Sequence, residues 1–229
     1  MALYAISDVH LSLGSDKPMD VFPGWEDYTR RLQENWCRLV QPEDTVVIAG
    51  DISWAMKLED VERDFAYLHA LPGKKLLLKG NHDYWWTTRR KMDTYLCEKG
   101  FDNLTFVHNS AVPVGEYAVC GTRGWLVGSM SEEDQKIVNR EAGRLKASLD
   151  EAQKLGKTPV VFLHYPPIYD GVRCQPILSL LQQYGIHDCY YGHIHGRQAA
   201  KRAPVGEYEG IRMHLLSCDH VKFVPQRIF

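Results

Sequence analysis

The sequence predicts an α/β fold in which helices cover a largely buried sheet. Short runs rich in Val, Ile, Leu and aromatic residues recur along the chain, as is typical of buried strands. Between them, apolar residues recur at steps of three and four, as is typical of amphipathic helices. No linker and no convincing repeat interrupts the 229 residues. We therefore expect a single domain over residues 1–229.

The strands are predicted where an apolar run is short and bounded by polar or turn-forming residues. Eight runs meet this description, and they cover residues 3–6, 45–49, 75–78, 105–107, 117–120, 159–163, 188–191 and 211–216. Such runs are apolar on both faces, which favours strands covered by helices on both sides of the sheet.

The helices are predicted from three apolar stripes. These stripes cover residues 25–39, 58–68 and 138–152. Ser131, followed by three acidic residues, is the predicted N-cap of the third helix. The tryptophans and leucines of the stripes are interpreted as core residues.

Composition excludes several classes of protein. The hydrophobic fraction of 45% and the charged fraction of 24% are typical of a globular protein. With 27 basic and 29 acidic residues the net charge is −2, which argues against binding of a long nucleic acid. No run is long enough for a membrane helix, the N-terminus lacks a basic start, and the six cysteines form no CxxC pair. We expect a cytoplasmic location and no membrane contact.

Polar side chains stand at the ends of five predicted strands. Asp8 and His10 form a D-x-H pair after the first strand, and an extended backbone there would place both on one face. Gly50-Asp51 ends the second strand, where an aspartate is usually only a helix cap. Each of these features is weak alone.

The other three strand ends continue the pattern. Gly80-Asn81-His82-Asp83 follows the third run, His164 ends a later one, and His193 and His195 lie between two glycines after another. Alone, Asn81 would be a turn residue and His164 a structural histidine. Because ligands gather at the carboxyl ends of strands in such folds, five strand ends together predict one metal site.

These residues resemble the calcineurin-like metallophosphoesterases. The family pattern D-x-H, G-D, G-N-H-[DE], a lone H and G-H-x-H is matched in order from Asp8 to His195. The resemblance implies a four-layer αββα sandwich, with two mixed β-sheets flanked by helices. It also implies a hydrolase that acts on phosphoester bonds.

The resemblance implies two divalent transition-metal ions, either Mn, Fe, Zn or Co. One would be held by Asp8, His10, Asp51 and His195. The second would be held by the ligands Asp51, Asn81, His164 and His193, so that the Asp51 carboxylate bridges the two ions.

The resemblance also implies a mechanism. A bridging water, acidified by both ions, gives a hydroxide that attacks phosphorus in line. His82 would assist the leaving oxygen, and Asp83 would orient His82 through its second ring nitrogen. Arg123, between two glycines, is either a substrate-binding contact to phosphate or a plain surface arginine.

One departure bears on the substrate. The protein Ser/Thr phosphatases of the family have an arginine a few positions after the bridging aspartate, and residues 52–56 contain none. Tryptophans occupy the loops instead, and each either stacks on a flat substrate group or packs in the core. They are Trp54, Trp85, Trp86 and Trp125.

The sequence therefore favours a small phosphodiester or nucleotide-like substrate. A phosphomonoesterase or protein phosphatase is the alternative within the family. A hydrolase acting on another bond and a non-catalytic metal-binding scaffold of the same fold are the rivals outside it. The scaffold would be expected to have lost ligands or the histidine of the GNH motif, and all are present.

Overall fold

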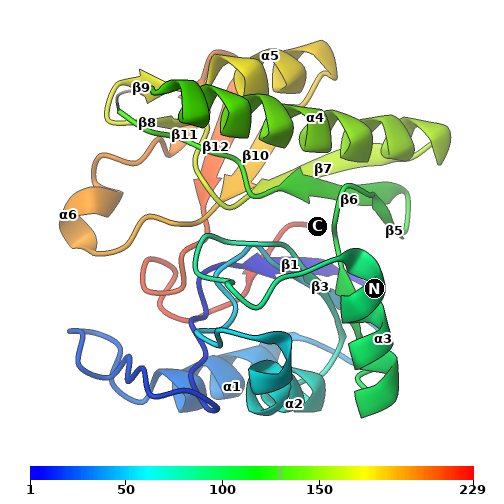
Figure 1. The fold of residues 1–229 in the computed structure, drawn as a ribbon, viewed down its shortest axis with the longest axis vertical. Coiled ribbons are helices and arrows are strands. Elements are labelled where there is room, and N and C mark those ends of the chain that lie inside the picture. Colours follow the sequence, from blue (N-terminus) through cyan, green and yellow to red (C-terminus); the bar gives the residue numbers. More distant parts are fainter. Residues whose placement is uncertain (129) are drawn as a thin grey trace.

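The structure is a computed structural model, and it describes residues 1–128 and 130–229. Its two large sheets lie face to face in the middle of the molecule, with helices on both outer sides (Figure 1). This arrangement confirms the predicted α/β class and the four-layer αββα sandwich. Among the described helices, none has the length and hydropathy needed to cross a membrane.

The first sheet has the strand order β13-β1-β2-β3-β4. Strands β1 to β4 are parallel, with Leu3 opposite Thr45 and Thr45 opposite Lys74, whereas β13 is antiparallel. The strands are β1 (Leu3–Ile6), β2 (Thr45–Ile48), β3 (Lys74–Leu77), β4 (Leu104–Phe106) and β13 (Gln226–Arg227). Helices α1 (Tyr28–Leu39), α2 (Glu62–Ala70) and α3 (Arg89–Lys99) belong to this half, and a 3₁₀ turn, η1 (Leu58–Val61), leads into α2.

The second sheet has the order β11-β12-β10-β7-β6-β5, with a parallel centre and antiparallel edges. Its strands are β5 (Val112–Val114), β6 (Tyr117–Thr122), β7 (Thr158–Leu163), β10 (Asp188–Tyr191), β11 (Gly206–Tyr208) and β12 (Ile211–Leu215). Helices α4 (Glu132–Lys154) and α5 (Gln175–Gln183) cover its outer face (Figure 1). The hairpin β8 (Ile168–Tyr169) and β9 (Val172–Arg173) and the short α6 (Arg197–Ala200) complete the elements.

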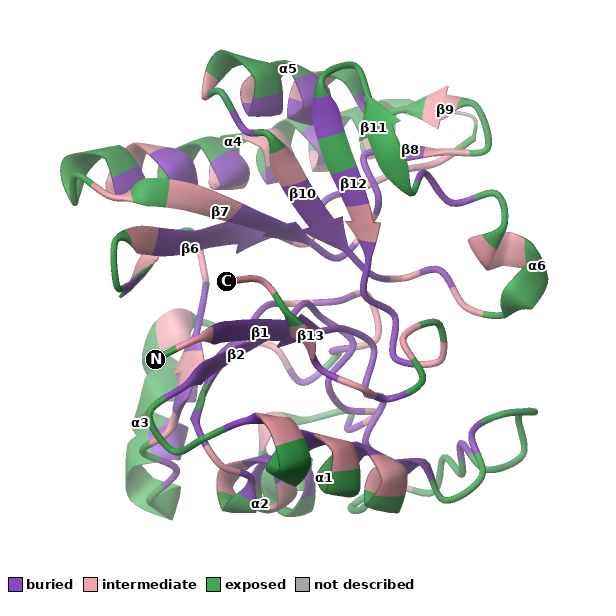
Figure 2. Ribbon diagram, turned by 180° about the vertical axis from the view of Figure 1, so that it is seen from behind, coloured by how far each residue is buried: buried purple, intermediate pink, exposed green. Residues whose placement is uncertain are grey.

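Three layers of apolar side chains hold these elements together. In β1, Tyr4 and Ile6 pack on the helix side, whereas Leu3 and Ala5 pack between the two sheets. A third cluster, which includes Leu145 of α4, lies between the second sheet and its helices. The strands are accordingly buried along most of their length, whereas the helices expose one face (Figure 2). This packing explains why the strand sequences are apolar at successive positions.

The predicted elements are confirmed within one or two residues at most ends, and Ser131 caps α4 in a capping box with Asp134. The first apolar stripe, over residues 25–39, predicts a helix that begins three residues too early. Helix α1 begins at Tyr28, and Trp25 packs against the core from the preceding loop. Several short elements were not predicted from periodicity. They are α3, α5, α6, β5, β8, β9, β11 and β13.

Candidate metal centre

The seven predicted ligands lie in the loops that follow β1, β2 and β3 of the first sheet and β7 and β10 of the second. Because these strands are parallel within each sheet, their carboxyl ends meet at one edge of the sandwich. The chain brings six of the ligands into two groups, in each of which the donor atoms lie within 4.8 Å of one another. The groups are Asp8, His10 and His195, and Asp51, His164 and His193.

The first group is built around Asp8, which is fully buried at the end of β1. The Nε2 atom of His195 lies 3.3 Å from its Oδ1. His10 faces the same point, with its Nε2 atom 3.2 Å from the Nε2 atom of His195. Two ring nitrogens and a carboxylate oxygen from the loops after β1 and β10 therefore converge on one position.

The second group contains His164, whose side chain is fully buried. Its Nε2 atom lies 3.4 Å from Oδ2 of Asp51. The same nitrogen lies 2.7 Å from Oδ1 of Asn81, which brings the seventh predicted ligand to this group. The ring of His193 is 5.2 Å from that of His164, centroid to centroid.

Asp51 lies between the two groups. Its Oδ2 atom is 3.4 Å from His164 and 3.6 Å from Nε2 of His10, which belongs to the other group. The other oxygen accepts a hydrogen bond from the backbone N–H of His82 at 2.8 Å. One carboxylate thus faces both sets of ligands, as a bridging ligand must.

The backbone at the ligands corrects one part of the sequence argument. Asp8, His10, Asp51 and His193 all have positive φ, between 44° and 71°. The D-x-H segment is therefore not extended, and the argument that two side chains share a strand face is wrong for it. In the H-x-H segment, His193 and His195 enter different groups, as the resemblance implies. Left-handed backbone at non-glycine residues costs free energy and concentrates at functional sites.

Two glycines allow the loops to approach this closely. A Cβ atom on Gly80 would overlap the backbone nitrogen and carboxylate of Asp51. A Cβ atom on Gly192 would overlap the side chains of Ser7 and Asp8. The glycines that precede Asn81 and His193 are thus required by space.

The ligands are held by further residues, of which Asp219 was missed in the sequence. Its Oδ1 atom lies 2.9 Å from Nδ1 of His195, and its Oδ2 atom accepts from the N–H of Gly196 at 2.7 Å. On His164, Nδ1 lies 3.1 Å from the carbonyl oxygen of Ala49. These partners fix the ring nitrogens that face away, leaving both Nε2 atoms for the centre. Asp219 also follows a predicted strand, so the strand-end rule would have identified it.

The pKa values of the histidines show how strongly they interact with the buried carboxylates of the centre. Burial favours the neutral form of His164, but the charge and hydrogen bond of Asp51 outweigh it and raise the pKa to about 9. Burial of His195 is outweighed in the same way by the charge of Asp8, and its pKa is raised to about 10. By contrast, burial lowers the pKa of His10 to about 4. Protons on these rings compete with cations, so cation binding weakens in acid.

The arrangement fits two divalent cations. The facing Nε2 atoms of His10 and His195 share at most one proton in a hydrogen bond. Imidazole nitrogens with carboxylate and amide oxygens are the donors that Mn, Fe, Zn and Co accept.

The predicted contact between His82 and Asp83 is not formed. Asp83 was expected to accept a hydrogen bond from the second ring nitrogen of His82, and this prediction is wrong. The oxygens of Asp83 accept instead from the backbone of Gly80, Ile52 and Ser53, at 2.7 to 3.2 Å, and Nδ1 of His82 has no partner among the described residues. Asp83 therefore fixes the two loops that carry Asp51 and Asn81, because four backbone and side-chain N–H groups saturate it.

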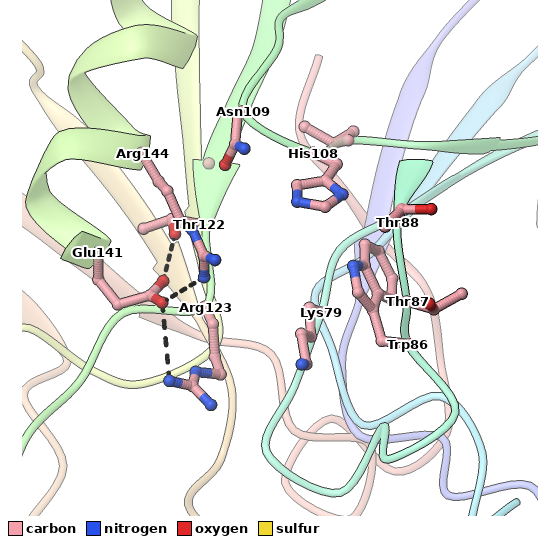
Figure 3. Close-up of a pocket in the computed structure, with 12 residues that line it drawn as sticks. Lys79, Trp86, Thr87, Thr88, His108, Asn109, Thr122, Arg123, Glu141 and Arg144 are labelled. Atoms are coloured by element: carbon pink, nitrogen blue, oxygen red, sulfur yellow. Dashed lines mark hydrogen bonds and ion pairs between the residues drawn. The ribbon is translucent and has the colours of Figure 1, made fainter. Parts of the chain in front are cut away.

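The tryptophans divide into two pairs. Trp85 is 2% exposed and packs in the core, and Trp125 donates from Nε1 to Asp134 of α4 at 3.0 Å. Trp54 is half-buried and stacks on the ring of His10 at 5.0 Å. Trp86 is half-buried and lines a cavity beside the loop of Asn81 (Figure 3). Trp54 thus lies against a proposed ligand, and Trp86 lies beside the loop that carries another.

Arg123 is less exposed than flanking glycines led us to expect. Its side chain is 16% exposed, lies over the ring of Trp125 at 4.9 Å, and has Nη2 3.6 Å from Oε1 of Glu141. Its carbonyl oxygen accepts from the N–H of His164 at 3.2 Å. Arg123 therefore lies directly beside the second ligand group.

Comparison with known proteins points to one family. The family model described as calcineurin-like phosphoesterase matches residues 1–197. Similar solved structures include a protein of unknown function from Aquifex aeolicus, with 16% identity, a TM-score of 0.56 and 99% and 95% of the two chains covered. A phosphopantetheinyl hydrolase from Mycobacterium tuberculosis has 15% identity, a TM-score of 0.55 and coverage of 100% and 95%. At this identity the structures share the fold. No curated protein matches the chain.

Proposed function

The chain belongs to the calcineurin-like phosphoesterase family and is a phosphoester hydrolase, and on that basis we propose that it works with two divalent cations on small phosphodiesters or nucleotide-like phosphoesters. One observation carries the dinuclear proposal. Asp51 faces His10 of one ligand group and His164 of the other, at 3.6 and 3.4 Å. Two cations at neighbouring positions repel each other, so an anion between them is required.

The two groups divide the ligands as the resemblance implies. Asp8, His10 and His195 would hold one cation, and Asn81, His164 and His193 the other, with Asp51 shared. When bound there, divalent cations supply Lewis acidity and neutralise charge on phosphoryl oxygens. Asp219 binds Nδ1 of His195, and the carbonyl of Ala49 binds Nδ1 of His164. These contacts orient the Nε2 atoms of both rings towards the proposed cation positions.

His82 is the proposed proton donor to the leaving oxygen. Its ring lies 5.7 Å from that of His10 and 4.4 Å from that of Trp54, and its side chain is partly exposed, so a substrate can reach it. Asp51 anchors its backbone N–H. Asp83 is a positioning residue, because it holds the loops and does not contact the His82 ring. A proton delivered from His82 would neutralise the departing alkoxide.

The preference for small substrates has three supports. Residues 52–56 lack the arginine found in the family's protein phosphatases. Trp54 and Trp86 remain partly exposed beside the ligands, where a flat group can stack. One protein of the same fold is named a phosphopantetheinyl hydrolase. Arg123 is the proposed contact to a phosphate oxygen not held by the cations.

A substrate panel tests this proposal. The manganese-loaded protein is assayed on bis(4-nitrophenyl) phosphate, 4-nitrophenyl phosphate, a cyclic nucleotide and a phosphopeptide. We expect the diester or the nucleotide to be turned over fastest, and Trp86→Ala to raise KM for the nucleotide, with Trp85→Ala as a core variant for comparison. A phosphopeptide turned over fastest would contradict the substrate class while leaving the cation site untouched.

A further inference from the structure

A cavity of about 380 Å³ opens beside the second ligand group. One wall comes from the first sheet's loops, with Lys79 after β3, Trp86 before α3 and His108 after β4. The other comes from the second half, with Arg123 after β6 and Arg144 of α4. Figure 3 shows Lys79 and Trp86 across the cavity from Arg123 and Arg144.

The lining carries an excess of positive charge. Lys79, Arg123 and Arg144 face one acid, Glu141, so the formal charge is 3 − 1 = +2 with His108 neutral. Glu141 is fully buried and already engaged. Its oxygens pair with Nη1 of Arg144 at 2.7 Å and Nη2 of Arg123 at 3.6 Å, and accept from the hydroxyl of Thr122 at 2.5 Å (Figure 3).

Two buried nitrogen atoms of the residues that line this cavity lack a partner within the described part of the chain. Nε of Arg123 and Nδ1 of His108 are buried without a hydrogen bond to any described residue. Among the same residues, Lys79 forms no ion pair. Burial lowers the pKa of His108, and the positive charges of Arg144, Arg89 and Lys79 lower it further. Buried donors without partners cost free energy, which an anion would recover.

Two residues that line the cavity adjoin proposed ligands of the metal centre. Lys79 lies two residues before Asn81, and the Arg123 carbonyl accepts from the N–H of His164 at 3.2 Å. This adjacency allows one substrate molecule to reach from the cations into the cavity.

We propose that this cavity binds a second phosphate group of the substrate, so that the enzyme acts on phosphoesters that carry two phosphate groups. The inference rests on the proposed function and narrows its substrate class. Phosphate is favoured because two guanidinium groups and an ammonium group surround the cavity, and a guanidinium binds phosphate in two-point contacts. The half-buried Trp86 ring provides an apolar wall for the part of the substrate that joins the two phosphates.

Binding of phosphonates tests the proposal without depending on turnover. Calorimetry on the manganese-loaded protein compares methylphosphonate with α,ω-alkylene bisphosphonates having one to four methylene groups. At one or more chain lengths we expect the bisphosphonate to bind about 10- to 100-fold more tightly than methylphosphonate. A gain of this size corresponds to one or two charge-assisted hydrogen bonds. In Lys79→Met that gain should fall to about twofold or less, with methylphosphonate affinity unchanged. Lys79→Arg should retain it.

Lys74→Met is the matched control, because Lys74 is exposed at the start of the same strand and does not line the cavity. It should keep the full gain. The proposal is overturned if no chain length binds more tightly than methylphosphonate, or if the gain persists in Lys79→Met. Absence of phosphoesterase activity in the parent would instead contradict the proposed function, and the binding comparison would still decide the second site.

Discussion

Single residues decide where the donor atoms of the candidate metal centre point. Four of the seven proposed ligands have left-handed backbone conformations. Residue type and spacing could not indicate this, because only a small share of Asp and His residues in proteins adopt such conformations. That these side chains lie close together could, by contrast, be predicted, because the carboxyl ends of parallel strands meet at one edge of a sheet. Asp219 also follows a strand, but it lies outside the motifs that carry the family resemblance.

Asp219 is expected to tune the first cation site. Asp219→Ala removes the acceptor 2.9 Å from Nδ1 of His195, so that the ring is free to rotate and its Nε2 atom becomes a poorer ligand. We expect the affinity for one of the two manganese ions to fall about 10- to 100-fold. Titration against a chelating indicator measures this loss. Asp102→Ala, at a side chain 90% exposed, is the control. Two ions bound with parental affinity in Asp219→Ala would show that Asp219 has no role in orienting His195.

His82 is expected to affect chemistry and not cation binding. His82→Gln should retain both ions and lower kcat by roughly 10²–10⁴ on an ester with a poor leaving group. On a 4-nitrophenyl ester the loss should be much smaller, since that leaving group departs without a proton. His187→Gln, at an exposed histidine outside the site, serves as control. Equal losses on both esters would argue against proton donation.

Among the helices and strands, the sequence predicts those in which the apolar pattern extends over many residues. The central strands and α4 were predicted because burial on defined faces imposes a pattern on many residues. Edge strands such as β5 and β13 have two or three residues, too few to form a period. Helix α3 was missed because six of its 11 residues are charged and its apolar face is narrow.

Strand β3 contains a buried lysine that gives a pH-dependent prediction. Lys75 is 0% exposed and its Nζ donates to the carbonyls of Leu71 and Gly73. Burial lowers its pKa to about 8, below the ordinary value of 10.5. Between these values the unfolded chain holds a proton that the folded chain has released, so folding is favoured as pH rises.

The measurement is the difference in free energy of unfolding between the parent and Lys75→Met. From pH 8 to pH 10.5 this difference should shift in favour of the parent by about 2–3 kcal/mol. Comparison with Lys74→Met, at the exposed neighbour, removes general effects of charge. A difference that stays constant over this range would mean that Lys75 titrates normally in the folded protein.

At the scale of the whole molecule, the candidate centre joins both halves of the sandwich. The family model ends at residue 197, but β12 and the turn after it lie beyond that point and supply Ser217 and Asp219 to the ligands. The four-layer architecture was predicted from a resemblance in motifs, since periodicity alone could not distinguish one sheet from two. The cavity between Lys79 and Arg144 could not be predicted, because it depends on how the two sheets pack.

Cation binding should stabilise the whole fold, since ligands from both sheets are assembled only in the folded chain. At a free concentration 100-fold above the dissociation constant, manganese should raise the free energy of unfolding by about 2.7 kcal/mol for each site. Chemical denaturation with and without metal measures the increase. Lowering the pH should reduce it, because protons on His164 and His195 compete with the cations. A stability independent of manganese would contradict this coupling.

The proposed bridging of two cations by Asp51 is tested by the number of manganese ions bound per chain. Elemental analysis of the reconstituted parent should give two ions, and Asp51→Asn should lose metal and phosphoesterase activity together, because the bridge has lost its charge. Asp16→Asn, at an exposed aspartate, should match the parent. A folded parent protein that binds no manganese would contradict the proposed cation site. An Asp51→Asn variant that still binds two ions would contradict the bridging role of Asp51.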